Sequence, residues 1–141
     1  MLTTERAEER VRTAGLRLTP QRRVVIEVLA GDTSHPRAED VAEQVARRVP
    51  GVSLSTVYKT LHEFADIGLV RELDGAGPMR FDPDSSDHAH LICDACGSVS
   101  DLEIPPSIGE ALALATPNAS VTRVDITVHV MCAACQSTRA Q

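Results

Sequence analysis

The stretch SDHAHLICDACGSVSD, residues 86–101, holds two histidines, two cysteines and three aspartates. Its cysteines form the C-x-x-C pair Cys93 and Cys96, and a second pair, Cys132 and Cys135, follows near the end of the chain. Each pair can direct two thiolates at one point, and two such pairs form the tetrahedral sulfur cage that zinc prefers. The sequence therefore predicts a structural zinc site formed by these four cysteines.

The spacing between the two cysteine pairs predicts a small domain held together by the ion. The 35 residues that separate the pairs exceed the ~15–20 of a usual zinc ribbon and leave room for a helix and a strand. Two alternatives are independent redox pairs and an iron–sulfur cluster. A thioredoxin-like redox pair needs a strand–helix–strand context, which the pattern does not show, and the zinc site uses every cysteine of the chain. Structural Zn²⁺ is the favoured interpretation.

The histidines of the same stretch indicate a second metal site. Residues i and i+2 of a strand point to the same face, so His88 and His90 can reach one ion. Asp82 lies just upstream, and Asp101 lies where the next strand can bring it alongside. Imidazole nitrogens with carboxylate oxygens suit Fe(II), Mn(II), Ni(II) or Zn(II). The alternative is a pair of exposed histidines on an acidic surface.

Charge is unevenly distributed along the chain. Residues 1–80 contain 12 Lys or Arg and 12 Asp or Glu, whereas residues 81–141 contain 2 and 8, so the second part carries the whole net charge of −6. This asymmetry predicts two domains with different partners. The N-terminal residues lack the apolar run of a signal peptide, and no segment approaches the ~18 apolar residues of a membrane span. We therefore expect a cytoplasmic protein with reduced thiols and no membrane partner.

The first part of the chain has the hydrophobic pattern of helices followed by a β-hairpin. Helices are expected at 4–14, at 20–29, from about 38 to before Pro50, and from a cap at Ser53 or Ser55 to about 65; strands are expected at 70–73 and 79–81, around a turn at 74–78. This order is typical of a winged helix-turn-helix, whose fourth helix enters the DNA major groove. The alternative is a generic helical bundle with a surface hairpin.

The second part of the chain has a different pattern, typical of a small α+β domain. Strands are expected at 88–93, 98–102 and 121–131, with a helix at 108–115 before the last strand.

These features together resemble the ferric uptake regulator (Fur) superfamily over essentially the whole chain. The matching segments are RLTPQR at 17–22, HP at 35–36, STVYKTL at 55–61, GLV at 68–70, RFD at 80–82, HAHLIC at 88–93 and the final C-x-x-C. The resemblance implies a homodimeric, metal-responsive repressor of operator DNA. It also implies a winged-helix DNA-binding domain at 1–82 and a metal-binding dimerisation domain at 83–141.

Within the superfamily the chain is most similar to the peroxide-sensing branch, mainly because Asp82 stands where iron-sensing relatives tend to carry Glu. The resemblance then implies a regulatory Fe²⁺ or Mn²⁺ held by His35, Asp82, His88, His90 and Asp101. Without the resemblance, His35 would be interpreted as a loop or N-cap residue before Pro36. Fe(II)-catalysed oxidation of His35 or His88 by peroxide would end repression. The alternative is an iron- or zinc-responsive repressor of metal uptake that does not sense peroxide.

DNA contacts are expected mainly from the fourth helix and from basic residues just before and within the second helix. Phosphate contacts are assigned to basic side chains, namely Arg17, Arg22, Arg23 and Lys59. The alternative for Arg22 and Arg23 is a solvated helix face. Ser55 and Thr56 can reach phosphates or base edges, and Tyr58 is the expected reader of a base edge. A metal-dependent hydrolase or redox enzyme is disfavoured, because no nucleophile or general base stands apart from the ligand set and no cofactor motif occurs. We therefore expect that this chain is not an enzyme.

Overall fold

The computed structural model describes residues 1–74, 77–84, 86 and 88–139. Its contacts divide the chain into two compact units, one built from Met1–Asp74 with Pro78–Ser85, the other mainly from Ser86–Gln141. The predicted domain boundary between residues 82 and 83 stays a prediction. Positions 75 and 76 of the predicted turn lie outside the described residues.

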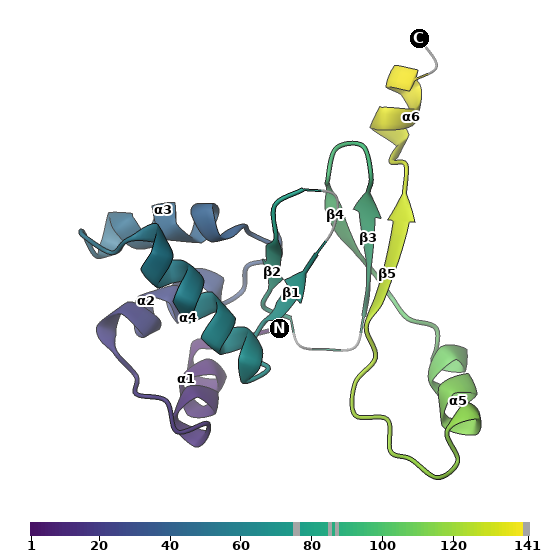
Figure 1. Ribbon diagram of the computed structural model, residues 1–141, viewed down its shortest axis with the longest axis horizontal. Helices are drawn as coiled ribbons and strands as arrows, with labels where there is room; N and C mark the ends of the chain where they lie inside the picture. The colour runs from purple at the N-terminus through teal and green to yellow at the C-terminus, as the bar shows by residue number, and fades with distance from the viewer. Residues whose placement is uncertain (75–76, 85, 87, 140–141) are drawn as a thin grey trace. The chain divides into compact units, whose positions relative to one another are not determined.

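The first unit contains four helices and a two-stranded antiparallel hairpin (Figure 1). In chain order these are α1 Thr4–Thr13, α2 Pro20–Leu29, α3 Ala38–Arg48, α4 Leu54–Asp66, β1 Arg71–Leu73 and β2 Arg80–Asp82. The order and type of every element agree with the sequence prediction, and the bounds differ by a few residues at most.

The helix starts are set by short-range hydrogen bonds to side chains. Thr19 Oγ1 accepts the N–H of Arg22 at 3.3 Å, and Pro20 occupies the first helical position of α2, where its missing N–H has no helical partner to lose. Ser53 Oγ accepts the N–H of Thr56 at 3.2 Å, so Ser53 is the cap of α4. Such caps fix where α2 and α4 begin from local sequence alone.

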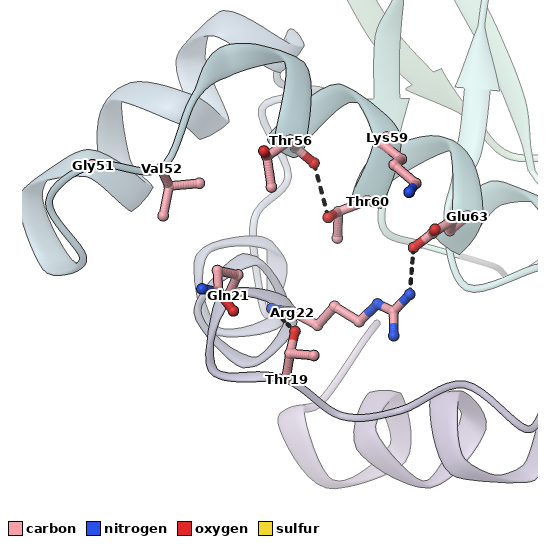
Figure 2. Close-up of a pocket in the computed structure, with 9 residues that line it drawn as sticks. All are labelled: Thr19, Gln21, Arg22, Gly51, Val52, Thr56, Lys59, Thr60 and Glu63. Carbon is pink, nitrogen blue, oxygen red and sulfur yellow. Dashed lines mark hydrogen bonds and ion pairs between the residues drawn. The ribbon is translucent and has the colours of Figure 1, made fainter.

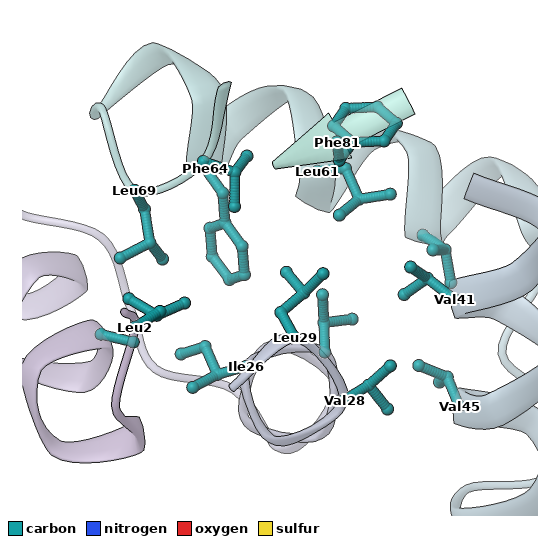
Figure 3. Packing of buried hydrophobic residues seen from close by; sticks show 14 of the residues in the cluster. Leu2, Ile26, Val28, Leu29, Val41, Val45, Leu61, Phe64, Leu69 and Phe81 are labelled. Atoms are coloured by element: carbon teal, nitrogen blue, oxygen red, sulfur yellow. The ribbon is translucent and has the colours of Figure 1, made fainter. Parts of the chain in front are cut away.

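A single apolar cluster joins the helices of the first unit to its hairpin (Figure 3). Ile26 and Leu29 of α2, Leu61 and Phe64 of α4, and Phe81 of β2 are all fully buried. Because the hairpin contributes Phe81 to the same core, it packs as the wing of a winged-helix fold. The alternative of a bundle with an independent surface hairpin is thereby excluded.

The second unit is a three-stranded sheet with two helices, an α+β arrangement as predicted (Figure 1). Its elements are β3 Ala89–Cys93, β4 Val99–Leu102, α5 Pro106–Ala115, β5 Ile126–Val130 and α6 Ala133–Arg139. The strand order is β4-β3-β5, with β4 antiparallel and β5 parallel to the central β3. Cys93 ends β3 and Cys96 lies in the turn between β3 and β4, so this pair does not begin a helix.

Two elements of the second unit differ from the prediction. The strand expected at 121–131 is limited to Ile126–Val130, because β5 pairs only along the five residues of β3. Helix α6 has no predicted counterpart. Its seven residues lack an apolar period, and its first turn is organised by the second cysteine pair, where Gln136 N–H donates to Cys132 O at 2.9 Å.

The second unit buries few apolar side chains. Among its described residues, the buried apolar positions are Ala89, Ile92 and Cys93, all in β3, while α5 buries none and Leu114 is 83% exposed. A unit with so little core needs another source of stability, such as a metal or a partner chain. None of the helices in the described part of the chain has the length and apolar character to cross a membrane.

Candidate metal centres and nucleic-acid interface

The four cysteines converge at one end of the second unit. Cys93 ends β3 and Cys132 follows β5, and the parallel pairing of these neighbouring strands brings the two C-x-x-C pairs together. One ligand atom from each cysteine lies within 4.8 Å of the others, and the sulfurs of Cys96 and Cys132 are 3.9 Å apart. Tetrahedral zinc with bonds of ~2.3 Å requires sulfurs about 3.8 Å apart, so the cage has the size for zinc.

Hydrogen bonds prepare two of these sulfurs for the thiolate form. Backbone N–H groups, first that of Cys132 and then that of Cys96, lower the pKa of Cys93 to about 6. Ser98, whose hydroxyl lies 3.2 Å from Cys96 Sγ, lowers the pKa of Cys96. The neighbouring sulfurs of Cys132 and Cys96 raise the pKa of Cys135 to about 12. Thiolates crowded in this way favour a cation among them.

A second cluster, which we call the histidine cluster, consists of His88, His90 and Asp101 in the same unit. Asp101 stands directly opposite His90 in the β3–β4 ladder. Its Oδ1 lies 3.4 Å from His88 Nε2 and 3.7 Å from His90 Nε2, and the two rings are 4.6 Å apart. Both histidines are buried. The sheet register sets His90 opposite Asp101, and His88, one residue before β3, also lies next to this carboxylate.

The orientation of His88 suits a metal ligand. Its Nδ1 lies 2.8 Å from the carbonyl oxygen of Ser86. A carbonyl only accepts, so Nδ1 donates to it, and Nε2 is the ring nitrogen that faces Asp101. A histidine that binds a metal typically donates its other ring N–H in this manner, which fixes the ring and its tautomer.

A smaller group, which we call the His35–Asp82 pair, lies in the first unit. His35 Nε2 is 3.8 Å from Asp82 Oδ2, and both side chains are buried. Asp82 is the last residue of β2, and its other oxygen accepts the N–H of Asp84 at 2.9 Å. A buried imidazole facing a buried carboxylate offers a nitrogen and an oxygen to one cation. The sequence pattern alone gave no reason to select His35, because it lies in a loop far from the other ligands.

The predicted DNA-contacting side chains of α4 are accessible. Ser55, Thr56 and Lys59 are exposed and Tyr58 is half-buried. The Tyr58 hydroxyl donates to Glu39 Oε1 of α3 at 3.3 Å. This contact fixes the ring on the surface of α4 and was not foreseen, since Glu39 lies 19 residues away.

The beginning of α2 meets α4 at a cavity of about 300 Å³ (Figure 2). Its walls include Thr19, Arg22, Thr56, Lys59 and Glu63. The Arg22 guanidinium is 2.7 Å from the Glu63 carboxylate and also donates to the carbonyl of Arg17. Arg17 and Arg23 are exposed. Arg22 thus reaches this surface as part of an ion pair, whereas Lys59 contributes a positive charge from the helix itself.

Together, a winged-helix unit and a small α+β unit with a four-cysteine cage define a class of two-part metal-binding proteins. Residues 13–130 match the Ferric uptake regulator family, and the chain belongs to that family.

The relatives of the chain include peroxide-responsive repressors, as predicted from Asp82. The peroxide-responsive repressor PerR of Staphylococcus epidermidis is 38% identical over 122 residues, which cover 86% of this chain and 79% of that protein. Among solved structures, the ferric uptake regulator of Helicobacter pylori superimposes with a TM-score of 0.78 at 23% identity, covering 95% of this chain and 94% of that one. The manganese-containing ferric uptake regulator of Pseudomonas aeruginosa gives 0.77 at 25% identity, covering 90% and 98%.

Proposed function

We propose that this chain is a cytoplasmic, metal-dependent transcriptional repressor that binds operator DNA as a homodimer and responds to hydrogen peroxide. The observation that carries the proposal is the histidine cluster, in which the Ser86 carbonyl orients the His88 ring so that its Nε2 faces Asp101. Similarity to a peroxide-responsive repressor over most of the chain supports the choice of signal.

In this proposal the four-cysteine cage holds Zn²⁺ permanently. The size of the cage and the lowered pKa of Cys93 and Cys96 fit four-thiolate coordination. A site with four protein ligands has no open position, so the ion stays structural. Its task is to stabilise the second unit, which has little apolar core.

The regulatory ion, Fe²⁺ or Mn²⁺, would be held by the histidine cluster together with the His35–Asp82 pair. Three nitrogens and two carboxylate oxygens form a donor set suited to either ion. Because the two groups belong to different units, ligation by both would select one arrangement of the DNA-binding units in the dimer. The ion stabilises that arrangement only by as much as it binds it better than others. Helix α4 of each subunit would then enter a major groove.

The side chains proposed to contact DNA in this arrangement lie on α4, before α2 and in the first turn of α2. Arg17, Arg22 and Lys59 would bind phosphates, with Ser55 and Thr56 beside them. Tyr58, positioned by its hydroxyl contact with Glu39, would read a base edge. These contacts, rather than a catalytic step, are the output of the protein, which we propose is a regulator and not an enzyme.

Loss of a ligand histidine is the proposed signal. Bound Fe²⁺ would supply the electron that activates hydrogen peroxide beside the ligands. His35 and His88 are the side chains proposed to take up oxygen, and an oxidised imidazole no longer presents the same nitrogen lone pair. The metal-bound arrangement would then no longer be favoured, and DNA would be released. An iron- or zinc-responsive repressor of metal uptake would use the same ligands without the oxidation step.

One experiment separates these two functions. Zinc-containing dimer is loaded anaerobically with Fe²⁺, treated with micromolar peroxide, digested and analysed by peptide mass spectrometry, with a Mn²⁺-loaded sample in parallel. We expect one added oxygen on the His35 or His88 peptide of the Fe²⁺ sample alone, together with loss of DNA binding. Unmodified histidines with retained DNA binding would instead support the metal-uptake repressor. In addition, His90→Ala should preserve the fold and abolish metal-dependent DNA binding.

A further inference from the structure

The backbone at His35 adopts a conformation that side chains other than glycine rarely take. Its φ is +52°, the one positive value at a non-glycine among the described residues. The left-handed region brings Cβ close to the next carbonyl oxygen, so a residue stays there only if its surroundings hold it. The direction of the His35 side chain therefore depends on the contacts that fix this loop.

Strand β2 supplies two of the contacts that hold this loop. The N–H of Phe81 donates to the carbonyl of Pro36 at 2.9 Å, and Nη1 of Arg80 donates to the carbonyl of His35 itself at 3.1 Å. Arg37 and Arg80 also form an isolated antiparallel bridge. The same strand ends at Asp82, whose carboxylate faces the His35 imidazole.

We propose that Arg80 is a positioning residue for the regulatory metal: its hydrogen bond to the His35 carbonyl sets the left-handed loop that directs the His35 imidazole toward Asp82. The inference rests on the proposed function, in which these two residues are ligands. Arg80 cannot be a ligand itself, since a guanidinium has no lone pair to offer. It acts on the ion only through the backbone of His35.

The charge of Arg80 and its hydrogen bond to His35 should have opposite effects on metal affinity, so a variant can distinguish them. A positive charge next to a cation site weakens binding by Coulomb repulsion, so its removal should strengthen metal binding if charge alone matters. Asp40 moderates that repulsion. Its pKa is lowered to about 2, chiefly by the hydrogen bond from Arg37 and to a small extent by the charge of Arg80. If Arg80 positions His35, its removal should weaken binding despite the charge.

The test is a Mn²⁺ titration of the zinc-containing dimer, in which the paramagnetic resonance signal of free Mn²⁺ gives Kd. Arg80→Met should bind Mn²⁺ about tenfold more weakly than wild type, a change equal to about 1.4 kcal/mol. Arg80→Lys keeps the charge and one donor, and should recover part of the loss. Arg47→Met is the matched control: it removes the same charge from an exposed i,i+4 pair of α3 and should leave Kd unchanged.

A second readout needs no bound metal. The backbone carbon shifts of His35 in the zinc-containing, Mn²⁺-free protein report its φ, and in Arg80→Met they should move from left-handed toward extended values. Equal or tighter Mn²⁺ binding by Arg80→Met, or unchanged His35 shifts, would overturn the positioning role while the proposed function stands. If the zinc-containing wild-type dimer binds no Mn²⁺, the proposed function itself is contradicted. If Arg80→Met does not fold, a Kd for Arg80→Lys equal to that of wild type overturns the inference, and a weaker one supports it.

Discussion

Replacing Cys96 by serine should remove zinc and unfold the second unit while leaving the first unit folded. Cys96 supplies one of four sulfurs, and its Sγ lies 3.9 Å from that of Cys132 across the cage. A serine hydroxyl is a poor ligand at neutral pH, because it would have to lose a proton with a far higher pKa than a thiol. The remaining three thiolates would bind zinc weakly and leave an open position.

The magnitude of the effect follows from what else stabilises the second unit. Binding of structural zinc contributes about 10–16 kcal/mol to folding of small zinc modules. The buried apolar side chains among the described residues of this unit, Ala89, Ile92 and Cys93, contribute only about 1.5–3 kcal/mol for each large one. Loss of even a third of the folding free energy that comes from zinc binding therefore exceeds the stabilisation by the apolar core.

The first unit has an independent source of stability. Its apolar cluster extends over α1–α4 and the hairpin, and none of the cysteines belongs to it. We therefore expect Cys96→Ser to contain little zinc by elemental analysis and to be monomeric by native mass spectrometry. Its helical circular dichroism should still melt in one cooperative transition, that of α1–α4.

A matched control lies on α6. The Ser137 hydroxyl only donates to the carbonyl of Ala133 one turn earlier, so Ser137→Ala should keep both zinc and dimer. A strong chelator added to wild type should reproduce the Cys96→Ser behaviour. A Cys96→Ser protein that stays folded and dimeric without zinc would show instead that the second unit is stable by its own packing.

Three further predictions concern the first unit. Glu63→Gln removes the carboxylate that binds Arg22 at 2.7 Å, so fluorescence anisotropy should show tighter binding to duplex DNA. The slope of log K against log salt concentration should become steeper by up to about 0.9, the value of one added phosphate contact. An unchanged slope would contradict a contact between Arg22 and DNA. Asp40 has its pKa lowered from 3.8 to about 2, so its stabilisation is complete above pH 3.8 and is lost as the pH falls through 2. Because Asp40 is 39% exposed, Asp40→Asn should cost less than about 1 kcal/mol in urea unfolding at pH 7 and nothing well below pH 2. Phe64→Ala, at a fully buried position, should lower the free energy of unfolding by about 3–5 kcal/mol, and a loss below 1 kcal/mol would show that α4 is not anchored there.

Much of the fold could be predicted from the sequence because its determinants are local. Apolar side chains at helical spacing gave α1–α4, and Thr19 with Pro20 marked the start of α2, since a cap acts within three residues. The two cysteine pairs indicated one cage because of ligand chemistry rather than chain position. The i, i+2 spacing of His88 and His90 in an extended segment indicated that both imidazoles can reach one ion, for the same short-range reason.

The rest depended on contacts between residues far apart in the chain, for which the local sequence carries no signal. The parallel pairing of β5 with β3 brings Cys132 to Cys93, 39 positions away, and sets where β5 begins and α6 follows. The left-handed backbone of His35 is held by a donor 45 residues later, Arg80. With the exceptions of His35 and helix α6, the residue pattern indicated which side chains can bind metal and which segments form helices. The orientation of those side chains could be seen only in the folded chain, because it is set by strand register and by hydrogen bonds that form after the chain has packed.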